Sequence, residues 1–451
     1  MSVFGGSLTG FGDKGMRLPL MQVLRQAWAD PDLRSKMLFV LAMWGVFVLG
    51  TVIPVPIPGL SADEVFEKLK NLPFFQLMDT FGGGAVRRVS LFALGLNPYI
   101  TASIIIQILT TALPEWKKEM QEGGEFARRT QNKRTRGLTV FLCVFQGLGL
   151  LKLMGSALPA MTPLQQAMVI VFWTAGAMFM LWLGEQISER GIGNGVSLMI
   201  FAGIIISLPN QVTQIRQGLA DGNIAIWQVA ILAAMFLATT WVVVLFTTAQ
   251  RRIPIQHMRR NVGTKVVGGQ SSYLPLSIAM AGVIPIIFAV SLIYIPHQFS
   301  MLFPPGSTMN TVLNNIGDFV NPGSPVLWKA LIGAGFYTIL IFFFTYFYTA
   351  IMYNVEDISN NLKRGGSFIP GVRPGKQTKD FLDGVISRIT VVGAGFLALV
   401  ALSQYITPRI AQLPQGAYNL IGGTSLLIMV SVALDTMRQI EANILMKQYG
   451  Q

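Results

Sequence analysis

The sequence contains little of what redox, metal or hydrolytic chemistry requires. Among its 451 residues there are one cysteine, Cys143, and two histidines, His257 and His297. A single cysteine cannot form an internal disulfide bond. One cysteine and two histidines are also too few for a typical metal site or a histidine proton relay. The glycine-rich stretches do not stand between a strand and a helix with the spacing of a P-loop or a dinucleotide-binding fingerprint. We therefore expect no metal, no cofactor and no enzymatic activity, so any energy source must be a partner or a gradient.

Charged residues are also scarce, at 12% of the chain, whereas hydrophobic residues make up 52% and the mean hydropathy is +0.53. Such a chain has too little polar surface to cover a soluble globule. Apolar stretches of about 20 residues, long enough to cross the hydrocarbon core of a bilayer, recur ten times. They lie near residues 37–56, 93–113, 138–157, 164–184, 196–213, 226–248, 276–296, 327–350, 385–406 and 417–434. The sequence thus predicts an all-α polytopic membrane protein with ten transmembrane helices.

The predicted spans contain few charged residues. Lys152, Lys329 and Arg388 all lie near span ends, where a long side chain can reach the membrane interface. An ion-coupled transporter would need polar groups that converge at mid-depth, and an intramembrane protease would need paired Asp, a Ser/His pair or a zinc motif. The spans contain no set of residues for a protease. A secondary transporter for a small solute remains one possible function.

Lysine and arginine are distributed unevenly between the two sides of the predicted bundle. If the amino terminus is cytosolic, that side carries 26 of the 34 basic residues. Positively charged short loops tend to remain in the cytosol, so we expect both termini there, with residues 1–36 as an amino-terminal segment and 435–451 as a tail. Apolar residues between 18 and 28 could form a short helix on the membrane surface, or this stretch could be a plain cytosolic tail.

The ten spans divide into two sets of five. The first half covers residues 37–213 and the second covers 214–434, with cytosolic loops at 249–275 and 351–384. A half with an odd number of spans must enter the membrane in the opposite sense to its partner, so the two halves can form an inverted repeat. No convincing sequence repeat links them, and this prediction rests on the span count.

Residues 57–92 do not fit a simple bundle. A polar stretch is followed by a short apolar run from Leu72 to Met78, which is too short to span, and then by Gly82-Gly83-Gly84. Glycine gives the backbone freedom at no steric cost. The segment is either an ordinary external loop or a re-entrant, movable element. Irregular backbone at membrane depth is tolerated only in protein or along a water-filled cavity, so the second interpretation implies a cavity.

Five separated blocks of the sequence resemble the SecY family. Residues 88–107, RVSLFALGLNPYITASIIIQ, closely resemble the second span of that family. The other blocks are WLGEQISERGIGNG at 182–195, MAGVIP at 280–285, FIPGVRPG at 368–375 and GGTSLLI at 422–428. They occur in one order and, together, cover essentially the whole ten-span chain.

The resemblance implies two five-helix halves around an hourglass pore that conducts unfolded secretory polypeptides across the bacterial plasma membrane. A ring of aliphatic side chains would close the pore, since a narrow apolar constriction gates by dewetting. The matching ring positions are Leu96, Ile100, Val196, Ile200, Ile287 and Ile428. Isoleucine is common in the family at two of them, Leu96 and Val196. Taken singly, each of the six is also a typical packing residue of a helix face.

The resemblance also implies a plug and a lateral gate. The plug region matches residues 72–84, with Phe74, Phe75, Leu77 and Met78 in its apolar part and Gly82, Gly83 and Gly84 as its hinge. The gate, through which signal sequences and membrane segments reach the lipid, would open between the second and seventh spans. Its polar candidates are Thr101, Gln107 and Ser291, which could equally be ordinary interhelical hydrogen-bonding groups.

The basic cytosolic loops carry the implied partner sites. The residues are Arg251, Arg252, Arg259, Arg260 and Lys265 in one loop and Arg373 in a turn between Pro370 and Pro374. In the family such loops bind the SecA motor ATPase or the translating ribosome, whose RNA attracts exposed arginine and lysine. Membrane topology and contact with lipid phosphates explain much of the same charge. The family also implies two small membrane subunits, SecE and SecG.

Overall fold

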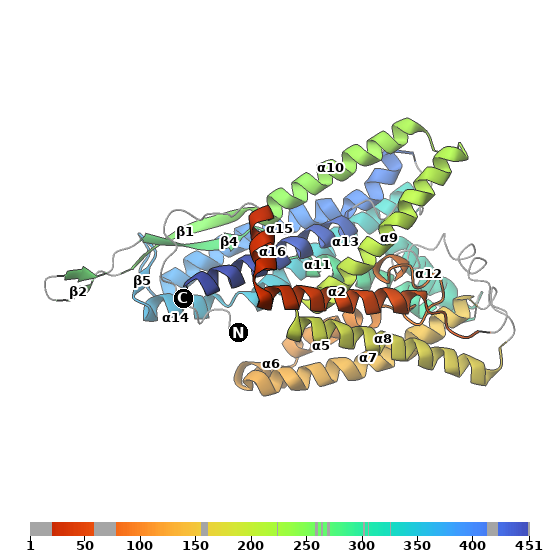
Figure 1. Ribbon diagram of the computed structural model, residues 1–451, viewed down its shortest axis with the longest axis horizontal. Helices are drawn as coiled ribbons and strands as arrows, with labels where there is room; N and C mark the ends of the chain where they lie inside the picture. The colour runs from red at the N-terminus through yellow and green to blue at the C-terminus, as the bar shows by residue number, and fades with distance from the viewer. Residues whose placement is uncertain are drawn as a thin grey trace.

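A computed structural model describes residues 20–57, 78–154, 161–222, 224–257, 260–262, 265–267, 271–300, 303–304, 306–324, 326–412 and 423–449. Its long helices run side by side along the long axis of the molecule (Figure 1). One helix lies at each predicted span: α2 (Pro31–Val52), α5 (Asn97–Ala112), α7 (Gly124–Met154), α8 (Pro163–Arg190), α9 (Gly195–Ala220), α10 (Ile226–Thr248), α11 (Ile284–Ser300), α13 (Leu327–Met352), α15 (Lys376–Ile410) and α16 (Thr424–Tyr449). The predicted polytopic helical fold is confirmed.

Two of these helices are short for a membrane span. At 1.5 Å per residue, the 16 residues of α5 and the 17 of α11 reach about 24 Å and about 26 Å, less than the roughly 30 Å of a hydrocarbon core. Each is preceded by a stretch of turns, at residues 91–96 and 278–283. Six other described helices are long and apolar enough to cross a membrane by length and composition.

The two halves of the chain share one packing scheme. The first half comprises α2, α5, α7, α8 and α9, and the second comprises α10, α11, α13, α15 and α16. In both, the second helix packs on the third, the third on the fourth and the fourth on the fifth, while the first packs on the fourth and fifth. Because five spans reverse the direction of entry, equivalent helices run in opposite senses, as expected for an inverted repeat. Across the seam between the halves, α11 contacts α5 and α7, and α9 contacts α16.

The second helix of each half also begins in the same way. Gly95 before α5 has φ 58° and Gly282 before α11 has φ 61°, and both helices carry a proline in their first turn, Pro98 and Pro285. A left-handed glycine permits a sharp change of direction, and a proline in the first turn costs no helical hydrogen bond. The shared Gly-x-x-Pro pattern is a short internal repeat that the sequence analysis missed.

The predicted loop at 249–275 contains β-structure, so the all-α description holds for the spans but not for this connection. Strand β1 (Gln250–His257) pairs antiparallel with β4 (Ser271–Ser277), and β2 (Arg260–Val262) pairs with β3 (Lys265–Val267). A fifth strand, β5 (Ser367–Phe368), pairs with the end of β1. Ile253 and Ile255 alternate along β1 and are buried in a small core with Leu276, Val355 and Leu382. This alternation explains why the segment is extended.

The described residues also form four shorter helices: α1 (Leu20–Ala29), α6 (Pro114–Glu122), α12 (Thr308–Val320) and α14 (Val355–Arg364). Helix α1 was expected on the membrane surface or as a tail, but its buried residues Val23 and Ala27 pack in a cluster with Ile440 and Ile444 of α16. Part of its apolar face is therefore covered by protein.

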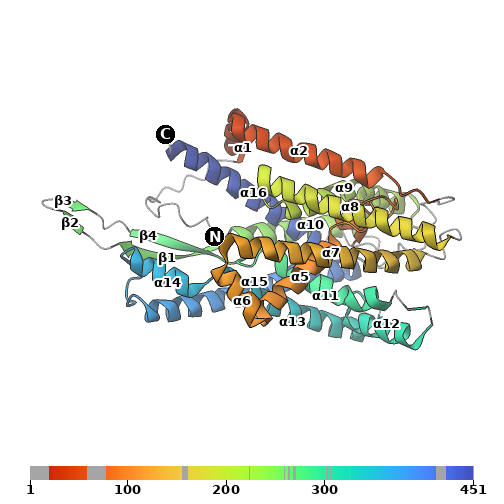
Figure 2. The same ribbon diagram turned by 90° about the horizontal axis from the view of Figure 1, so that it is seen from below.

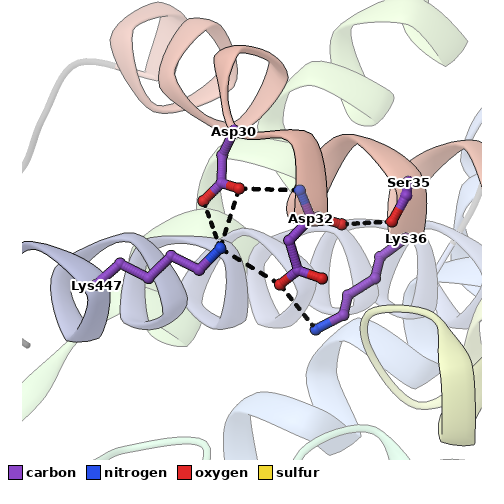
Figure 3. A network of polar contacts seen from close by, with 5 residues as sticks. All are labelled: Asp30, Asp32, Ser35, Lys36 and Lys447. Atoms are coloured by element: carbon purple, nitrogen blue, oxygen red, sulfur yellow. Dashed lines mark hydrogen bonds and ion pairs between the residues drawn. The ribbon is translucent and has the colours of Figure 1, made fainter.

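Segments from both ends of the chain lie at the same end of the bundle. The strands, α14 and α6 are found there, and α12 lies at the opposite end (Figures 1 and 2). Lys447 near the end of α16 donates to Asp30 at 2.8 Å and lies 3.4 Å from Asp32 (Figure 3). These contacts connect the corner between α1 and α2 to the last turns of α16.

Candidate functional site

The six predicted ring residues come from α5, α9, α11 and α16, the helices that meet across the seam, and from the residue just before α5. Leu96 caps the start of α5 and Ile100 lies in its first turn. Val196 and Ile200 belong to α9, Ile287 to α11 and Ile428 to α16. All six contribute to one apolar cluster. Four of them, including Ile428 at 1% exposed, are buried, while Val196 and Ile287 are half-buried against the cluster. The structure thus brings together side chains that are more than 330 positions apart in the sequence.

The end of the predicted plug packs on the same cluster. Residues 78–81 form one helical turn, and the buried side chain of Phe81 belongs to the cluster. The carbonyl oxygen of Phe81 lies so close to Gly203 of α9 that a Cβ at position 203 would overlap it. Gly203 is about one helical turn from Ile200. This segment therefore lies directly beside one of the ring helices.

The glycine triplet forms a closed turn. Gly83 and Gly84 have φ 68° and 82°, a conformation that residues with a side chain rarely adopt, whereas Gly82 does not have a positive φ. The N–H of Gly84 donates to the Asp79 carbonyl at 2.7 Å, and that of Gly83 donates to the Thr80 carbonyl at 3.2 Å. Backbone conformation therefore explains the glycine at two of the three predicted hinge positions.

The other plug residues divide between described and undescribed segments. Phe74, Phe75 and Leu77 lie outside the described residues. Met78 is buried in a second apolar cluster that also contains Val86 and Trp173.

An ion pair that the sequence analysis missed closes the same segment. Asp79 accepts the backbone N–H of Arg87 at 2.9 Å and its guanidinium at 3.2 Å. Asp79 is buried, with 6% of its surface exposed. Just beyond, the N–H of Leu91 donates to the Ile53 carbonyl at 2.9 Å and anchors the segment to the end of α2. One acidic residue eight positions before an arginine, in an otherwise apolar stretch, was the signal available in the sequence.

The three predicted gate residues lie on α5 and α11, which contact each other. Thr101 donates to the Asn97 carbonyl at 3.0 Å, Gln107 to the Ser103 hydroxyl at 3.2 Å, and Ser291 to the Ile287 carbonyl at 2.8 Å. Each of these three bonds stays within one helix. Gln107 also hydrogen-bonds the Tyr348 side chain of α13, in the other half. The contact between α5 and α11 can then separate without breaking the bonds of Thr101 and Ser291.

A polar bridge does cross the seam further along α11. Gln146 of α7 donates to Gln298 of α11 at 3.3 Å, and the rings of Phe145 and Phe299 lie with their centroids 4.9 Å apart. This bridge was not predicted, because the two glutamines are 152 positions apart in the sequence.

A cavity of about 210 Å³ lies beside the cluster, toward the strands. It is lined by Gly282, just before α11, by Leu427 of α16, and by the polar side chains of Thr247, Ser431, Asp435 and Arg438. The turn at 278–283 contributes to this lining, as expected for irregular backbone at membrane depth.

Of the predicted partner residues, Arg251 and Arg252 are exposed on β1, and the Arg252 guanidinium lies 4.8 Å from the centroid of the Tyr273 ring. Arg260 pairs in the β2–β3 ladder with Val267, and Lys265 pairs with Val262. Arg259 lies outside the described residues.

Arg373 is exposed in a turn that hydrogen bonds and glycine conformations fix in place. Its carbonyl accepts a hydrogen bond from the Thr378 hydroxyl at 2.9 Å, and Gly371 and Gly375 have φ 83° and 103°. The pairing of β1 with β5 and a 2.8 Å contact between His257 Nδ1 and the Ser367 hydroxyl connect this loop to the hairpin. The two basic loops thus form one platform.

No group of three or more His, Cys, Asp or Glu side chains within the described part of the chain could hold a metal ion. The geometry contains instead an apolar closure between two helical halves, with a polar cavity on one side of it.

Comparison with known proteins returned one family. The sequence model of SecY matches residues 90–437. The chain is 41% identical over 431 residues to the protein translocase subunit SecY of Halalkalibacterium halodurans, covering 93% of this chain and 96% of the relative. It is 38% identical over 455 residues to the SecY subunit of Chlamydia trachomatis, covering 95% and 97%.

Solved structures agree with this fold. One described as a protein conducting channel superposes with a TM-score of 0.66 at 19% identity, covering 91% of this chain and 92% of its own. Sec61 in the canine ribosome-channel complex gives 0.61 at 17% identity, with the same coverage. Nothing in these comparisons supports a small-solute transporter.

Proposed function

The chain belongs to the SecY family, and we propose that it forms the channel of a bacterial protein translocase, which conducts unfolded secretory polypeptides. It is a multi-pass protein of the bacterial membrane. One observation carries the proposal. Aliphatic side chains from the four seam helices meet in one cluster, and the segment around Phe81 packs on it. A closure made from flexible apolar side chains can separate around a polypeptide and exclude water when they meet again.

The six ring residues and the plug are assigned on this basis. Opening the pore requires the helices of the two halves to move apart and residues 78–84 to leave α9. The gate residues Thr101 and Ser291 hydrogen-bond within their own helices, which supports a gate between α5 and α11 that opens sideways to lipid. Signal sequences and membrane segments would leave through it.

The end of the molecule that carries the strands is proposed to face the cytosol, with both termini on that side. Two observations support this orientation. The segments predicted to be cytosolic contain 26 of the 34 lysine and arginine residues, and the described parts of these segments gather at one end of the bundle (Figure 1). Short basic loops rarely cross a membrane.

The platform of β1, β4 and the Arg373 turn is proposed to bind the SecA motor and the ribosome. Exposed arginine side chains on a platform held by backbone pairing suit acidic protein surfaces and RNA. Two solved structures with the same fold come from ribosome complexes, one of canine Sec61 and one of yeast Ssh1. The family resemblance supports SecE and SecG as further subunits.

Site-directed photocrosslinking tests the channel. A photoreactive residue is placed at Ile100 or Ile428, in the cluster, or at Leu237, which is 67% exposed near the middle of α10. A secretory precursor arrested halfway through the membrane should crosslink to positions 100 and 428 and not to 237. A precursor that reaches the far side without touching either cluster position would overturn the proposed pore.

A further inference from the structure

Helix α12 carries a row of large apolar side chains that remain exposed. Met309, Val312, Ile316 and Phe319 follow each other at steps of three, four and three residues, and are 53%, 46%, 45% and 40% exposed, respectively. At 100° per residue these four lie within an arc of about 80°. A single exposed apolar residue needs no explanation, but a continuous row along a helix indicates a specific contact.

A different face of α12 is packed on α11. Asn310 donates to the Ser300 carbonyl at 2.8 Å, and the Asn314 side chain lies 3.4 Å from Nδ1 of His297. Gly317 is buried against the His297 ring, so closely that an added Cβ would lie 2.7 Å from a ring atom. Polar groups and a glycine therefore attach α12 to the end of α11, antiparallel to it.

A third face is polar and exposed. Thr308, Thr311 and Asn315 lie within an arc of about 60°, next to the apolar row. A helix with one face on protein, one apolar and one polar fits the boundary between lipid and water, where both environments meet along one helix.

The surroundings of α12 place it at the level of such a boundary. The Phe319 ring packs edge-on against Trp328 with centroids 5.4 Å apart, and Lys329 Nζ lies 5.2 Å from the centroid of the Phe319 ring. Tryptophan and lysine at the start of a spanning helix are typical of a membrane interface.

The carboxyl end of α12 lies deeper than the start of α13. An added Cβ at Gly333 would lie 2.6 Å from the backbone of Asn321, just after α12, and Gly333 is about 9 Å along α13 from Leu327. Leu327 and Leu331 of α13 are themselves 66% and 65% exposed. The apolar row of α12 is therefore close to side chains that a bilayer must cover.

We propose that the apolar face of α12 binds the bilayer at the boundary between headgroups and acyl chains, on the side opposite the strands. Since α12 is fixed to the end of α11, it acts as an interfacial anchor for that helix. Resting on the proposed function, in which α11 is a gate helix, this anchor would restrain sideways movement of α11 during gating. A protein subunit covering the same face is the competing occupant.

Electron paramagnetic resonance of spin labels tests the anchor without any translocation. The full chain, carrying Cys143→Ala, is labelled at one introduced cysteine and reconstituted into vesicles of phosphatidylethanolamine and phosphatidylglycerol. Labels replace Val312 or Ile316 on the apolar face, Thr311 or Asn315 on the polar face, and Leu237 of α10 as a reference for lipid. Collision with oxygen reports lipid exposure, and collision with a water-soluble nickel chelate reports water exposure.

The labels at 312 and 316 should favour oxygen over nickel at least threefold more than the labels at 311 and 315. Introducing Ile316→Asp should abolish this difference for the label at 312, while Thr311→Asp should leave it unchanged. Equal access to nickel at all four positions would overturn the anchor, and so would exclusion of both reagents from 312 and 316, the result for a protein partner. A lipid-like signal at 237 shows insertion, so neither result depends on whether the channel conducts polypeptides.

Discussion

Replacing Gly203 with alanine should displace the plug from the closed channel. The new Cβ would overlap the carbonyl oxygen of Phe81, which is backbone and cannot rotate away. The clash exists only while residues 78–84 pack on α9. Either the segment moves out or the packing around it is strained.

The change in the free-energy difference between the closed and open states can be estimated from the clash, which only the closed state contains. Overpacking by one methyl group costs about 1–3 kcal/mol. The gain of up to about 1 kcal/mol from alanine in a helix applies to both states, since α9 is helical in each, and does not affect their ratio. The closed state should therefore lose about 1–3 kcal/mol relative to the open one. At 1.4 kcal/mol per factor of ten, the open population rises by roughly 5-fold to 150-fold.

Ion conductance in planar bilayers measures this population without a motor or a precursor. Gly335→Ala in α13 is a matched control, because its added Cβ meets nothing within 4 Å. The Gly203→Ala channel should leak ions and the Gly335→Ala channel should remain closed. If folded Gly203→Ala protein conducts no more than the unchanged chain, the packing of Phe81 on α9 does not hold the pore shut.

Four further predictions concern the ring, the platform, the plug turn and the terminal contact. Ile428→Asn should hydrate the closure and admit precursors with poor signal sequences, and unchanged leak and stringency in export assays would remove Ile428 from the ring. Arg373→Glu should impair SecA-driven export in vesicles while the melting temperature stays the same, so normal export would remove Arg373 from the partner site. Asp79→Asn removes the charge from the Asp79–Arg87 ion pair, in which the Arg87 side chain is 28% exposed, and should destabilise the turn by about 1.5–3 kcal/mol, the range for a hydrogen bond to a charged group. Faster proteolysis near Gly84 would reveal the loosened turn, and an unchanged rate would contradict it. The hydrogen bond with Lys447 lowers the pKa of Asp30 below 3.8 and raises the pKa of Lys447 above 10.5, so this pair contributes stability between those values and loses it as pH falls through the Asp30 pKa or rises through the Lys447 pKa. The difference in melting temperature between the unchanged chain and Lys447→Gln should therefore be constant from about pH 5 to about pH 9, and a strong slope inside that window would contradict the assignment.

The helical spans could be predicted because crossing a bilayer is a local requirement. The bounds of α10, Ile226–Thr248, match the predicted span at 226–248, since a run of apolar residues between polar ends needs no knowledge of the rest of the chain. The start of α11 was placed at 276, but the helix begins at Ile284. Hydropathy did not distinguish the end of β4 and the turn at 278–283 from a helix.

The site was predicted in a different way. Hydropathy marks Ile100, Ile287 and Ile428 only as apolar residues in spans, and the resemblance to the SecY family singled them out. That the side chains share one cluster is a property of the packing of α5, α9, α11 and α16. The Asp79–Arg87 pair, the Gln146–Gln298 bridge and the three faces of α12 were not predicted, because each depends on which segments meet.

Composition and the order of apolar segments determined by themselves that this chain enters a membrane and how often it crosses. Those properties arise from the transfer of each segment between water and lipid, which depends on that segment alone. Only the tertiary structure decided that two halves meet at an apolar closure, that two basic loops form one platform and that α12 turns its apolar face outward. Contacts between distant segments depend on close packing in three dimensions, to which residues far apart in the sequence contribute together.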